Sequence, residues 1–456
     1  MPDHNLLGGG SAETVLVPGV LAAMLIAIIL ILTLPRRMIV VPFVTICVLV
    51  PASQTLVLGG IHLFVARIVI LCGLVRLVVS RINGKADVLA GGWHEVDTLF
   101  LGWALCRAFA FTIRYGTTAA VVNQCGFIWD TVGGYFFVRF AIRTEQDIRN
   151  AIRTLAFVAS VVAIGMVIEQ RSLTNVFSAI GGQAPAIRDG RIRSQGPFSH
   201  AILAGVFGAT TVPLFYRLWL MNRDRFVAAV GVIAGTTMVF TSAASTAVGA
   251  YVAGIVAICA WPCRRHMRAI RWGMVGGTFA LALVMKAPVW FLLARLDLVG
   301  GSTGYHRAML IDQAVQRFGE WWLIGASNNQ GWGVGLDMWD VQNEFVAQGF
   351  TGGLLALILF VLLVSRTFRL IGVARKAARS DRRQGWLVWV LGAVMVAHVA
   401  AFIGSDYFDQ TRFWWFTTLA IIIAATVPGR PRQYNRSQTI RSQSADAIVL
   451  PAAIGR

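Results

Sequence analysis

Long apolar runs separated by mostly short polar stretches dominate this chain. A membrane-spanning helix needs about 20 mostly apolar residues, and about thirteen runs approach that length. They lie at 15–34, 38–58, 61–79, 99–113, 117–142, 151–168, 201–220, 226–242, 246–261, 272–285, 346–364, 386–404 and 413–427. The pattern predicts an all-α, polytopic bundle of about 12–13 transmembrane helices, with 1–456 as one integral membrane domain.

Two long polar segments, 170–200 and 286–345, interrupt this pattern. A sealed bundle needs only short turns, whereas a long polar excursion costs chain entropy and commonly carries function. We expect the second segment to be a large loop with short helices. The tail at 428–456 is polar, basic and rich in Ser and Gln, which predicts a disordered segment near the membrane surface.

Composition agrees with a membrane protein. The 456 residues are 57% hydrophobic and 13% charged, whereas soluble domains average about 25% charged residues. The net charge of +19 would also fit nucleic-acid binding. Its placement in loops between apolar runs is instead what membrane orientation requires, so no nucleic acid is expected. The six cysteines show no metal-site spacing, and we expect no metal and no cofactor.

Basic clusters predict the orientation of the spans. Positive charge gathers at 36–37, 217–225, 264–271, 366–383 and 430–441, and such loops normally face the cytoplasm. Alternating spans make these five positions mutually consistent. The same parity places both long polar segments outside.

Three arginines lie close together in the first outer segment. Arg188, Arg191 and Arg193 fall within six residues, just ahead of the run at 201–220. Outer arginines oppose the usual charge bias, so an anion should compensate them. Lipid headgroups or the neighbouring Asp189 would suffice. A pyrophosphate group is the functional alternative, because the guanidinium fork fits phosphate oxygens.

The second outer segment combines an expected helix with aromatic and acidic residues. The spacing of apolar positions predicts an amphipathic helix over 304–316, with His306 and Arg307 in its first turn. Tryptophans 321, 322, 332 and 339 follow, either as interface anchors or as stacking surfaces for sugars. Asp340, Gln342, Asn343 and Glu344 then lead into a span.

Several ionisable residues fall inside apolar runs, where they normally pair or face a polar cavity. Arg107 and Asp130 lie on consecutive spans, so a structural ion pair between them is expected where their depths match. Arg76 and Glu169 lie near span ends, from which they can reach the interface.

The stretch Arg193-Ser-Gln-Gly-Pro-Phe-Ser-His200 resembles the Arg–Gly–Phe–His pattern of the O-antigen ligase and O-antigen polymerase family. The Thr241–Thr246 turn is similar to a Thr/Ser turn of that family. Arg307 precedes a Gly-rich loop, and Gly349-Phe-Thr-Gly-Gly-Leu354 opens a span, as in the second family signature. The resemblance covers about 164–364. Ligases carry a His-Asn pair where this chain has Gln342-Asn343, which favours a polymerase.

The resemblance implies a GT-C-like glycosyltransferase in the bacterial cytoplasmic (inner) membrane, with its active site outside. Its activity would be to polymerise undecaprenyl-diphosphate-linked oligosaccharide repeat units into exopolysaccharide or O-antigen, without a metal. Membrane lipids and polysaccharide export proteins are the other partners it implies. Arg193 and Arg307 would stabilise the charge that develops on the leaving diphosphate, supported by Arg188 and Arg191.

The acceptor hydroxyl needs a group that takes its proton. Glu344 and His306 are the catalytic candidates, and Asp340 and Asp312 are further choices for this role. Substrate contacts are expected from a second set: His200, Asp340, Gln342 and Asn343.

Two alternatives remain open. A ligase would move a finished glycan from the same carrier to another lipid or protein. A transporter or flippase would do no chemistry. Transporters commonly show inverted repeats, which this sequence lacks, and its polar residues gather on one face of the membrane.

Overall fold

The computed structural model describes residues 14–58, 61–84, 88–188, 190–220, 224–295, 304–332 and 340–426. The expected disordered tail at 428–456 lies outside the described residues. So do Asp189, Trp339 and two stretches of the second outer segment, 296–303 and 333–339.

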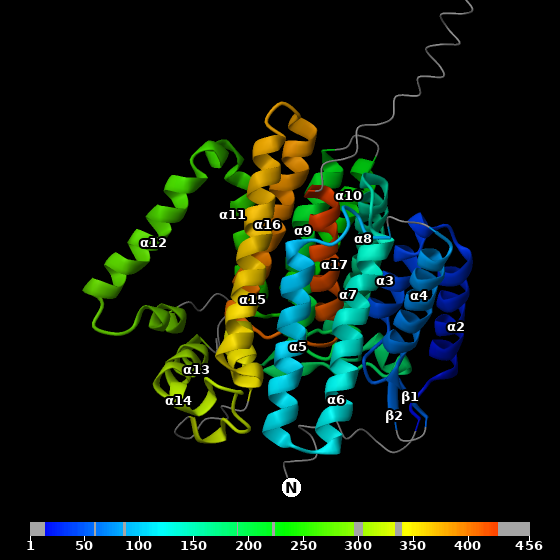
Figure 1. Ribbon diagram of the computed structural model, residues 1–456, viewed down its shortest axis with the longest axis horizontal. Coiled ribbons are helices and arrows are strands. Elements are labelled where there is room, and N and C mark those ends of the chain that lie inside the picture. Colours follow the sequence, from blue (N-terminus) through cyan, green and yellow to red (C-terminus); the bar gives the residue numbers. More distant parts are fainter. Residues whose placement is uncertain are drawn as a thin grey trace, which may run out of the picture. The chain divides into compact units, whose positions relative to one another are not determined.

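Helices form nearly all of the described structure (Figure 1). The helices are α2 (Pro18–Thr33), α3 (Val40–Leu49), α4 (Val65–Ile82), α5 (Glu95–Tyr115), α6 (Thr118–Ile128), α7 (Gly134–Ala141), α8 (Glu145–Ser172), α9 (Ala201–Trp219), α10 (Arg225–Thr241), α11 (Ser245–Cys259), α12 (Met267–Val284), α13 (Gly304–Gln316), α14 (Phe318–Trp321), α15 (Glu344–Ala377), α16 (Arg382–Gly404) and α17 (Asp409–Thr426). Short turns of helix are η1 (Arg36–Met38), η2 (Trp129–Gly133), η3 (Val176–Ile180), η5 (Trp261–Arg265), η6 (Val289–Arg295) and η7 (Gln330–Trp332). Two antiparallel hairpins complete the described elements: β1 (Thr55–Leu58) with β2 (Ile61–Phe64), and β3 (Ala186–Arg188) with β4 (Arg191–Arg193).

The all-α prediction is confirmed, and several helices could cross a membrane. Among the described residues, five helices are long and apolar enough to do so: α5, α8, α9, α15 and α16. A sixth results if α12 and η6, bent by 89°, count as one span. The other apolar runs contain helices too, but some runs include strands or several short helices; α3, for example, has only 10 residues, and α4 carries three arginines. The expected total of 12–13 spans therefore stays a prediction.

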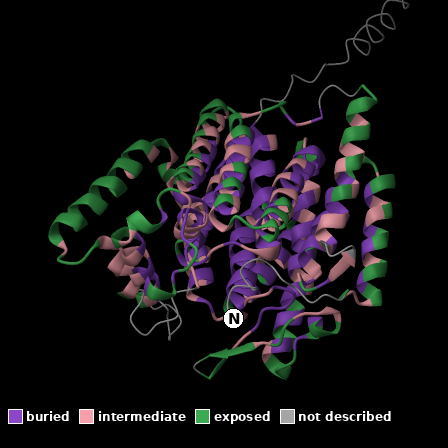
Figure 2. Cartoon of the chain, turned by 60° about the horizontal axis from the view of Figure 1, so that its bottom comes forward, coloured by how far each residue is buried: buried purple, intermediate pink, exposed green. Residues whose placement is uncertain are grey.

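The core of the bundle surrounds α9. This helix is buried along almost its whole length, with Phe207 and Phe215 fully enclosed. It packs against α8, α10, α11 and α16, and Figure 2 shows the buried residues gathered in the middle of the bundle. In contrast, α12 buries none of its residues and stands apart from its neighbours in Figure 1.

Helix α15 is kinked where the Gly-Gly-Leu motif of the sequence falls. Gly353 has φ +76°, and a Cβ there would lie 2.4 Å from the carbonyl oxygen of Leu323. Only glycine adopts this conformation without strain. The Leu354 N–H donates to Trp322 instead of to Phe350, and Arg114 donates to the freed Phe350 carbonyl at 2.9 Å. The motif thus joins α15 to the second outer segment.

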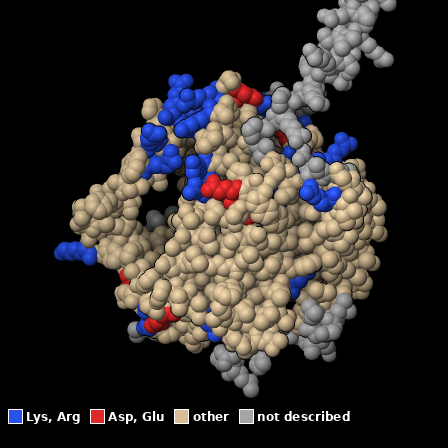
Figure 3. Space-filling view, in the orientation of Figure 1, with Lys and Arg blue, Asp and Glu red and all other residues tan. Residues whose placement is uncertain are grey.

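Charge is distributed unevenly between the two ends of the bundle. In Figure 3, most visible Lys and Arg gather over the upper end, where α15 turns into α16 in Figure 1. The elements α13, α14 and β1–β2 lie at the opposite end. This asymmetry has the form that the positive-inside rule describes.

The expected ion pair between Arg107 and Asp130 is wrong. Asp130 lies in η2, a π-helical turn, and pairs with Arg67 at 2.9 Å. Arg107 instead stacks over the Phe127 ring, 4.6 Å from its centroid. The extra residue in a π turn changes the direction in which side chains point. The positions of Arg107 and Asp130 along their apolar runs do not reveal this change of direction.

Candidate functional site

A short hairpin presents Arg193. Strands β3 and β4 pair Arg188 with Arg191 and Ala186 with Arg193, and the turn between them has Gly190 at φ +71°. Arg188 and Arg191 are exposed, whereas Arg193 is half-buried. The three arginines therefore differ: two lie outermost, and the third points toward the bundle.

Glu169 fixes the backbone that follows Arg193. Its two carboxylate oxygens accept hydrogen bonds from the N–H groups of Gln195, at 3.1 Å, and Gly196, at 2.9 Å. Gly196 has φ +57°, and the Ser194 N–H donates to the Thr241 carbonyl at 3.1 Å. Glu169 is fully buried, so it does not reach the interface as the sequence suggested. It is instead the anchor of the Arg193–His200 stretch.

The guanidinium of Arg193 has no hydrogen-bond or ion-pair partner among the residues that the structure describes. Its Nε is buried and makes no hydrogen bond, and no described carboxylate pairs with it. Burial lowers the pKa of Arg193, and the positive charge of Arg188 lowers it further. A buried cation without a counter-ion is costly, so this position favours an anion from outside the chain.

Arg307 is a second buried arginine whose Nε makes no hydrogen bond to a described residue. It lies on α13, which confirms the helix expected at 304–316, and its side chain is only 8% exposed. Its Nε also has no hydrogen-bond partner among the described residues. The pKa of Arg307 falls to about 10, first through burial and then through the charges of Arg193 and Arg188. The structure thus brings together two outer segments that are distant in the sequence.

His200 borders the two arginines. It is the N-cap of α9, and its Nδ1 accepts a hydrogen bond from the Ile202 N–H at 3.1 Å. Burial and the charge of Arg193 lower its pKa. The imidazole is therefore neutral near pH 7, with Nε2 as the protonated nitrogen. It can donate one hydrogen bond to a ligand.

Asp340 supplies negative charge beside these cations. It acts on the pKa of both Arg307 and His200. Gln342 Nε2 donates to the Asp340 carboxylate at 2.6 Å. His306 Nε2 lies 3.4 Å from the Asp340 carbonyl oxygen, and because a carbonyl only accepts, His306 is the donor there. This contact assigns the proton to Nε2 and leaves Nδ1 as the nitrogen that carries the lone pair.

Glu344 and Asn343 are occupied in holding the bundle together. Glu344 accepts hydrogen bonds from the Tyr407 N–H and from Gln348 Nε2, both at 2.6 Å. Asn343 caps α15 by accepting from the Val346 N–H, and it donates to the Ile403 carbonyl at 3.0 Å. Asn343 thus joins α15 to the end of α16, and Glu344 joins it to the turn between α16 and α17. Glu344 thus has little free capacity to accept a substrate proton.

The tryptophans divide into two groups. Trp321 and Trp332 belong to a small buried core with Ala314 and Ala326. Their indole N–H groups donate to the Ala314 carbonyl and to Glu320. Trp322 is 47% exposed. Trp321 and Trp332 are therefore packing residues. The sequence alone left open whether they pack or stack on sugars.

Asp406 is the residue that the sequence analysis missed. It lies in the short turn between α16 and α17, near Glu344 and Asp340. Burial and then these two carboxylates raise its pKa to about 7. No described side chain donates a hydrogen bond to its carboxylate. The stretch Ser405-Asp-Tyr-Phe-Asp409 gave no signal because it resembles any polar turn between two spans.

Arg412 and Arg107 extend the network inward from Asp406. Both are near enough to Glu344 and Asp406 to interact with their charges. Arg412 Nε donates to the Tyr407 carbonyl at 2.9 Å. The site therefore has Arg193 and Arg307 at one end, the carboxylates of Asp340, Asp406 and Glu344 in the middle, and Arg412 and Arg107 beyond them.

A metal site is not formed by the described part of the chain, where no group of three His, Cys, Asp or Glu residues could hold an ion. Comparison with models of known protein families finds no match. Comparison with curated proteins finds no significant match either.

Proposed function

We propose that this protein is a glycosyltransferase that joins undecaprenyl-diphosphate-linked oligosaccharide repeat units at the outer face of the bacterial cytoplasmic membrane. One observation carries the proposal: half-buried Arg193 and buried Arg307, from two separate segments, lie near each other, and neither forms an ion pair with a described carboxylate. A diphosphate supplies the missing negative charge, and the guanidinium fork matches its oxygens.

In the proposed glycosyl transfer, the arginines bind the leaving group and a carboxylate serves the acceptor. The acceptor hydroxyl oxygen forms a bond to the anomeric carbon of the donor while the bond from that carbon to the diphosphate oxygen breaks. The electron pair stays on the diphosphate, where Arg193 and Arg307 stabilise the developing charge. His200 donates a hydrogen bond to a neighbouring oxygen.

We propose that Asp406 is the general base that accepts the proton of the acceptor hydroxyl. A general base works best when its pKa lies near the operating pH, and that of Asp406 is about 7. Of the candidates from sequence, Glu344 has both carboxylate oxygens engaged with Gln348 and Tyr407, and His306 donates from Nε2 to the Asp340 carbonyl. Asp312 is also engaged, with Trp290 and Gln316. Asp340 assists by raising the proton affinity of Asp406.

Orientation and resemblance support the same proposal. The arginine pair lies on segments whose expected side is outside, opposite to the strongly basic loops. The stretch from Arg193 to His200 resembles the O-antigen ligase and polymerase family, and Gln342 in place of a histidine favours the polymerase.

The test uses purified protein in lipid nanodiscs with lipid-linked oligosaccharide. The expected products are free undecaprenyl diphosphate and a longer carrier-linked glycan. Arg193→Ala and Arg307→Ala are each expected to reduce product by about a hundredfold or more, while Arg→Lys restores only part of it. Transfer to a different lipid or protein would indicate a ligase. Movement of the substrate across the bilayer without release of diphosphate would indicate a transporter and refute the proposal.

A further inference from the structure

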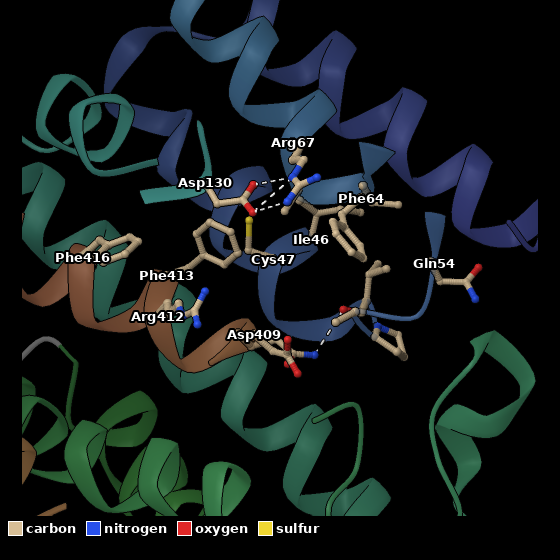
Figure 4. Close-up of a pocket in the computed structure, with 16 residues that line it drawn as sticks. Ile46, Cys47, Gln54, Phe64, Arg67, Asp130, Asp409, Arg412, Phe413 and Phe416 are labelled. Atoms are coloured by element: carbon tan, nitrogen blue, oxygen red, sulfur yellow. Dashed lines mark hydrogen bonds and ion pairs between the residues drawn. The ribbon is translucent and has the colours of Figure 1, made fainter. Parts of the chain in front are cut away.

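A small, partly open cavity adjoins the candidate site (Figure 4). It lies between the end of α3, the start of α4, η2 and the start of α17, and has a volume of about 190 Å³. Gln410 on its wall donates to the Pro197 carbonyl at 2.8 Å, and Asp409 bonds to Ser199. The cavity is thus built directly against the Arg193–His200 stretch.

One wall carries a bidentate ion pair. Arg67 donates from Nε to Asp130 Oδ1 and from Nη2 to Oδ2, both at 2.9 Å, and from Nη1 to the His62 carbonyl at 2.8 Å. Both side chains keep about a fifth of their surface exposed, and Figure 4 shows them beside Cys47. A carboxylate has about four lone-pair sites and Arg the five N–H donors of its guanidinium, so this pair keeps both acceptor and donor capacity for a ligand.

The opposite wall offers the complementary groups. Apart from the Nε bond to Tyr407, Arg412 makes no hydrogen bond to a described residue, so its terminal amino groups remain donors. Gln410 is 3% exposed, and its Oε1 is a buried acceptor without a partner in the described chain. A buried polar atom left unpaired is costly, and here it lines a cavity.

Charge balance indicates the class of ligand. The lining residues include two arginines, Arg67 and Arg412, and two aspartates, Asp130 and Asp409, so the cavity is neutral overall. A phosphate would prefer the unbalanced cations at Arg193 and Arg307. An uncharged molecule with many hydroxyl groups uses donors and acceptors alike, and Phe64, Phe413 and Phe416 offer apolar faces to its C–H groups.

Size restricts the ligand further. The cavity has about six times the roughly 30 Å³ that one water occupies in the liquid, and it is smaller than the pockets of about 300–1,000 Å³ that hold drug-sized ligands. This space suits one sugar ring and excludes an oligosaccharide chain.

We infer that this cavity is the subsite for the terminal sugar ring of the acceptor, an inference that rests on the proposed glycosyl transfer. Arg412 lines the cavity and also interacts with Asp406 and Asp130. A ring held against Arg412 would present a hydroxyl group toward Asp406. The inner cavity then selects the acceptor, while the outer arginines hold the diphosphate.

The test measures binding rather than turnover, by saturation-transfer NMR on the full-length protein in nanodiscs. The probes are the methyl glycosides of glucose, galactose, mannose and N-acetylglucosamine, with inorganic pyrophosphate as the anion probe. At least one glycoside is expected to bind the wild-type protein. Ala66→Phe, which fills the cavity from α4, is expected to weaken that binding at least tenfold and to leave pyrophosphate affinity unchanged. Val75→Phe, at a position 50% exposed on the same helix, is the matched control and should bind as the wild type does.

Two results overturn the inference: none of the glycosides binds the wild-type protein, or Ala66→Phe binds the sugar as tightly as Val75→Phe does. The proposed function fails separately. If the wild-type protein binds the glycoside but releases no diphosphate from lipid-linked oligosaccharide, the sugar site stands and the transferase does not.

Discussion

Replacing Arg307 by methionine is expected to stabilise the fold while abolishing activity. The pKa of Arg307 falls from 12.5 to about 10, and each pKa unit corresponds to about 1.4 kcal/mol. Burying this charge, and holding it beside Arg193 and Arg188, therefore costs on the order of 3 kcal/mol. Methionine has a similar length and no charge, so it removes the repulsion and preserves most of the packing.

The sign of this effect follows from linkage. Near pH 7 the Arg307 side chain is protonated in both the folded and the unfolded protein, so the full cost is present there. The cost is relieved only as the pH rises through about 10, where the folded state releases the proton first. The Arg307→Met variant should therefore have the larger free energy of unfolding at every pH below about 10, by up to about 3 kcal/mol.

The assay is thermal unfolding in detergent, with and without inorganic pyrophosphate. The wild-type protein should gain about 2.7 kcal/mol of stability when pyrophosphate is present at a hundred times its Kd, and the variant should gain much less. Diphosphate release should fall about a hundredfold or more. Arg317→Met is the control, because Arg317 is a partly exposed arginine paired with Glu320 at 3.1 Å; exposed pairs contribute about 0–1 kcal/mol. Lower stability of Arg307→Met together with normal activity would refute the assignment of Arg307 to an anion site.

Three further predictions concern other residues. Wild-type activity should rise with pH through about 7 as Asp406 loses its proton, and Asp406→Asn should remove this rise together with most of the activity. The same group is protonated in the fold between about pH 4 and 7, so its contribution to stability should decline as the pH rises through about 7 in a denaturation series. Glu169→Ala leaves two buried N–H groups unpaired, at about 1–3 kcal/mol each, and should lower both the unfolding temperature and pyrophosphate affinity; unchanged affinity would show that Glu169 does not position Arg193. Gly353→Ala should destabilise α15 by at least about 1–3 kcal/mol, whereas Gly372→Ala on the same helix, where a Cβ meets nothing within 4 Å, should be neutral or slightly stabilising in the same unfolding assay.

The sequence alone determined the helical membrane class and the short helix that carries Arg307. Both follow from local periodicity and from the length of apolar runs, which depend only on neighbouring residues. It also singled out Arg193 and Arg307, because arginines on the expected outer side stand out against the usual charge bias. The proximity of these two residues was a hypothesis, since nothing local relates the first outer segment to the second.

Only the tertiary structure decided which polar groups are free and which are engaged. Glu344 looked like a base by its position, but the Tyr407 N–H and Gln348 occupy its oxygens. Asp406 looks like a residue of an ordinary turn in the sequence, but burial and then the charges of Glu344 and Asp340 raise its pKa to about 7. Asp130 paired with Arg67 rather than Arg107 because a π turn redirected it. Burial and Coulomb interactions depend on distances in space, which link residues far apart in the chain and leave no trace in the pattern along it.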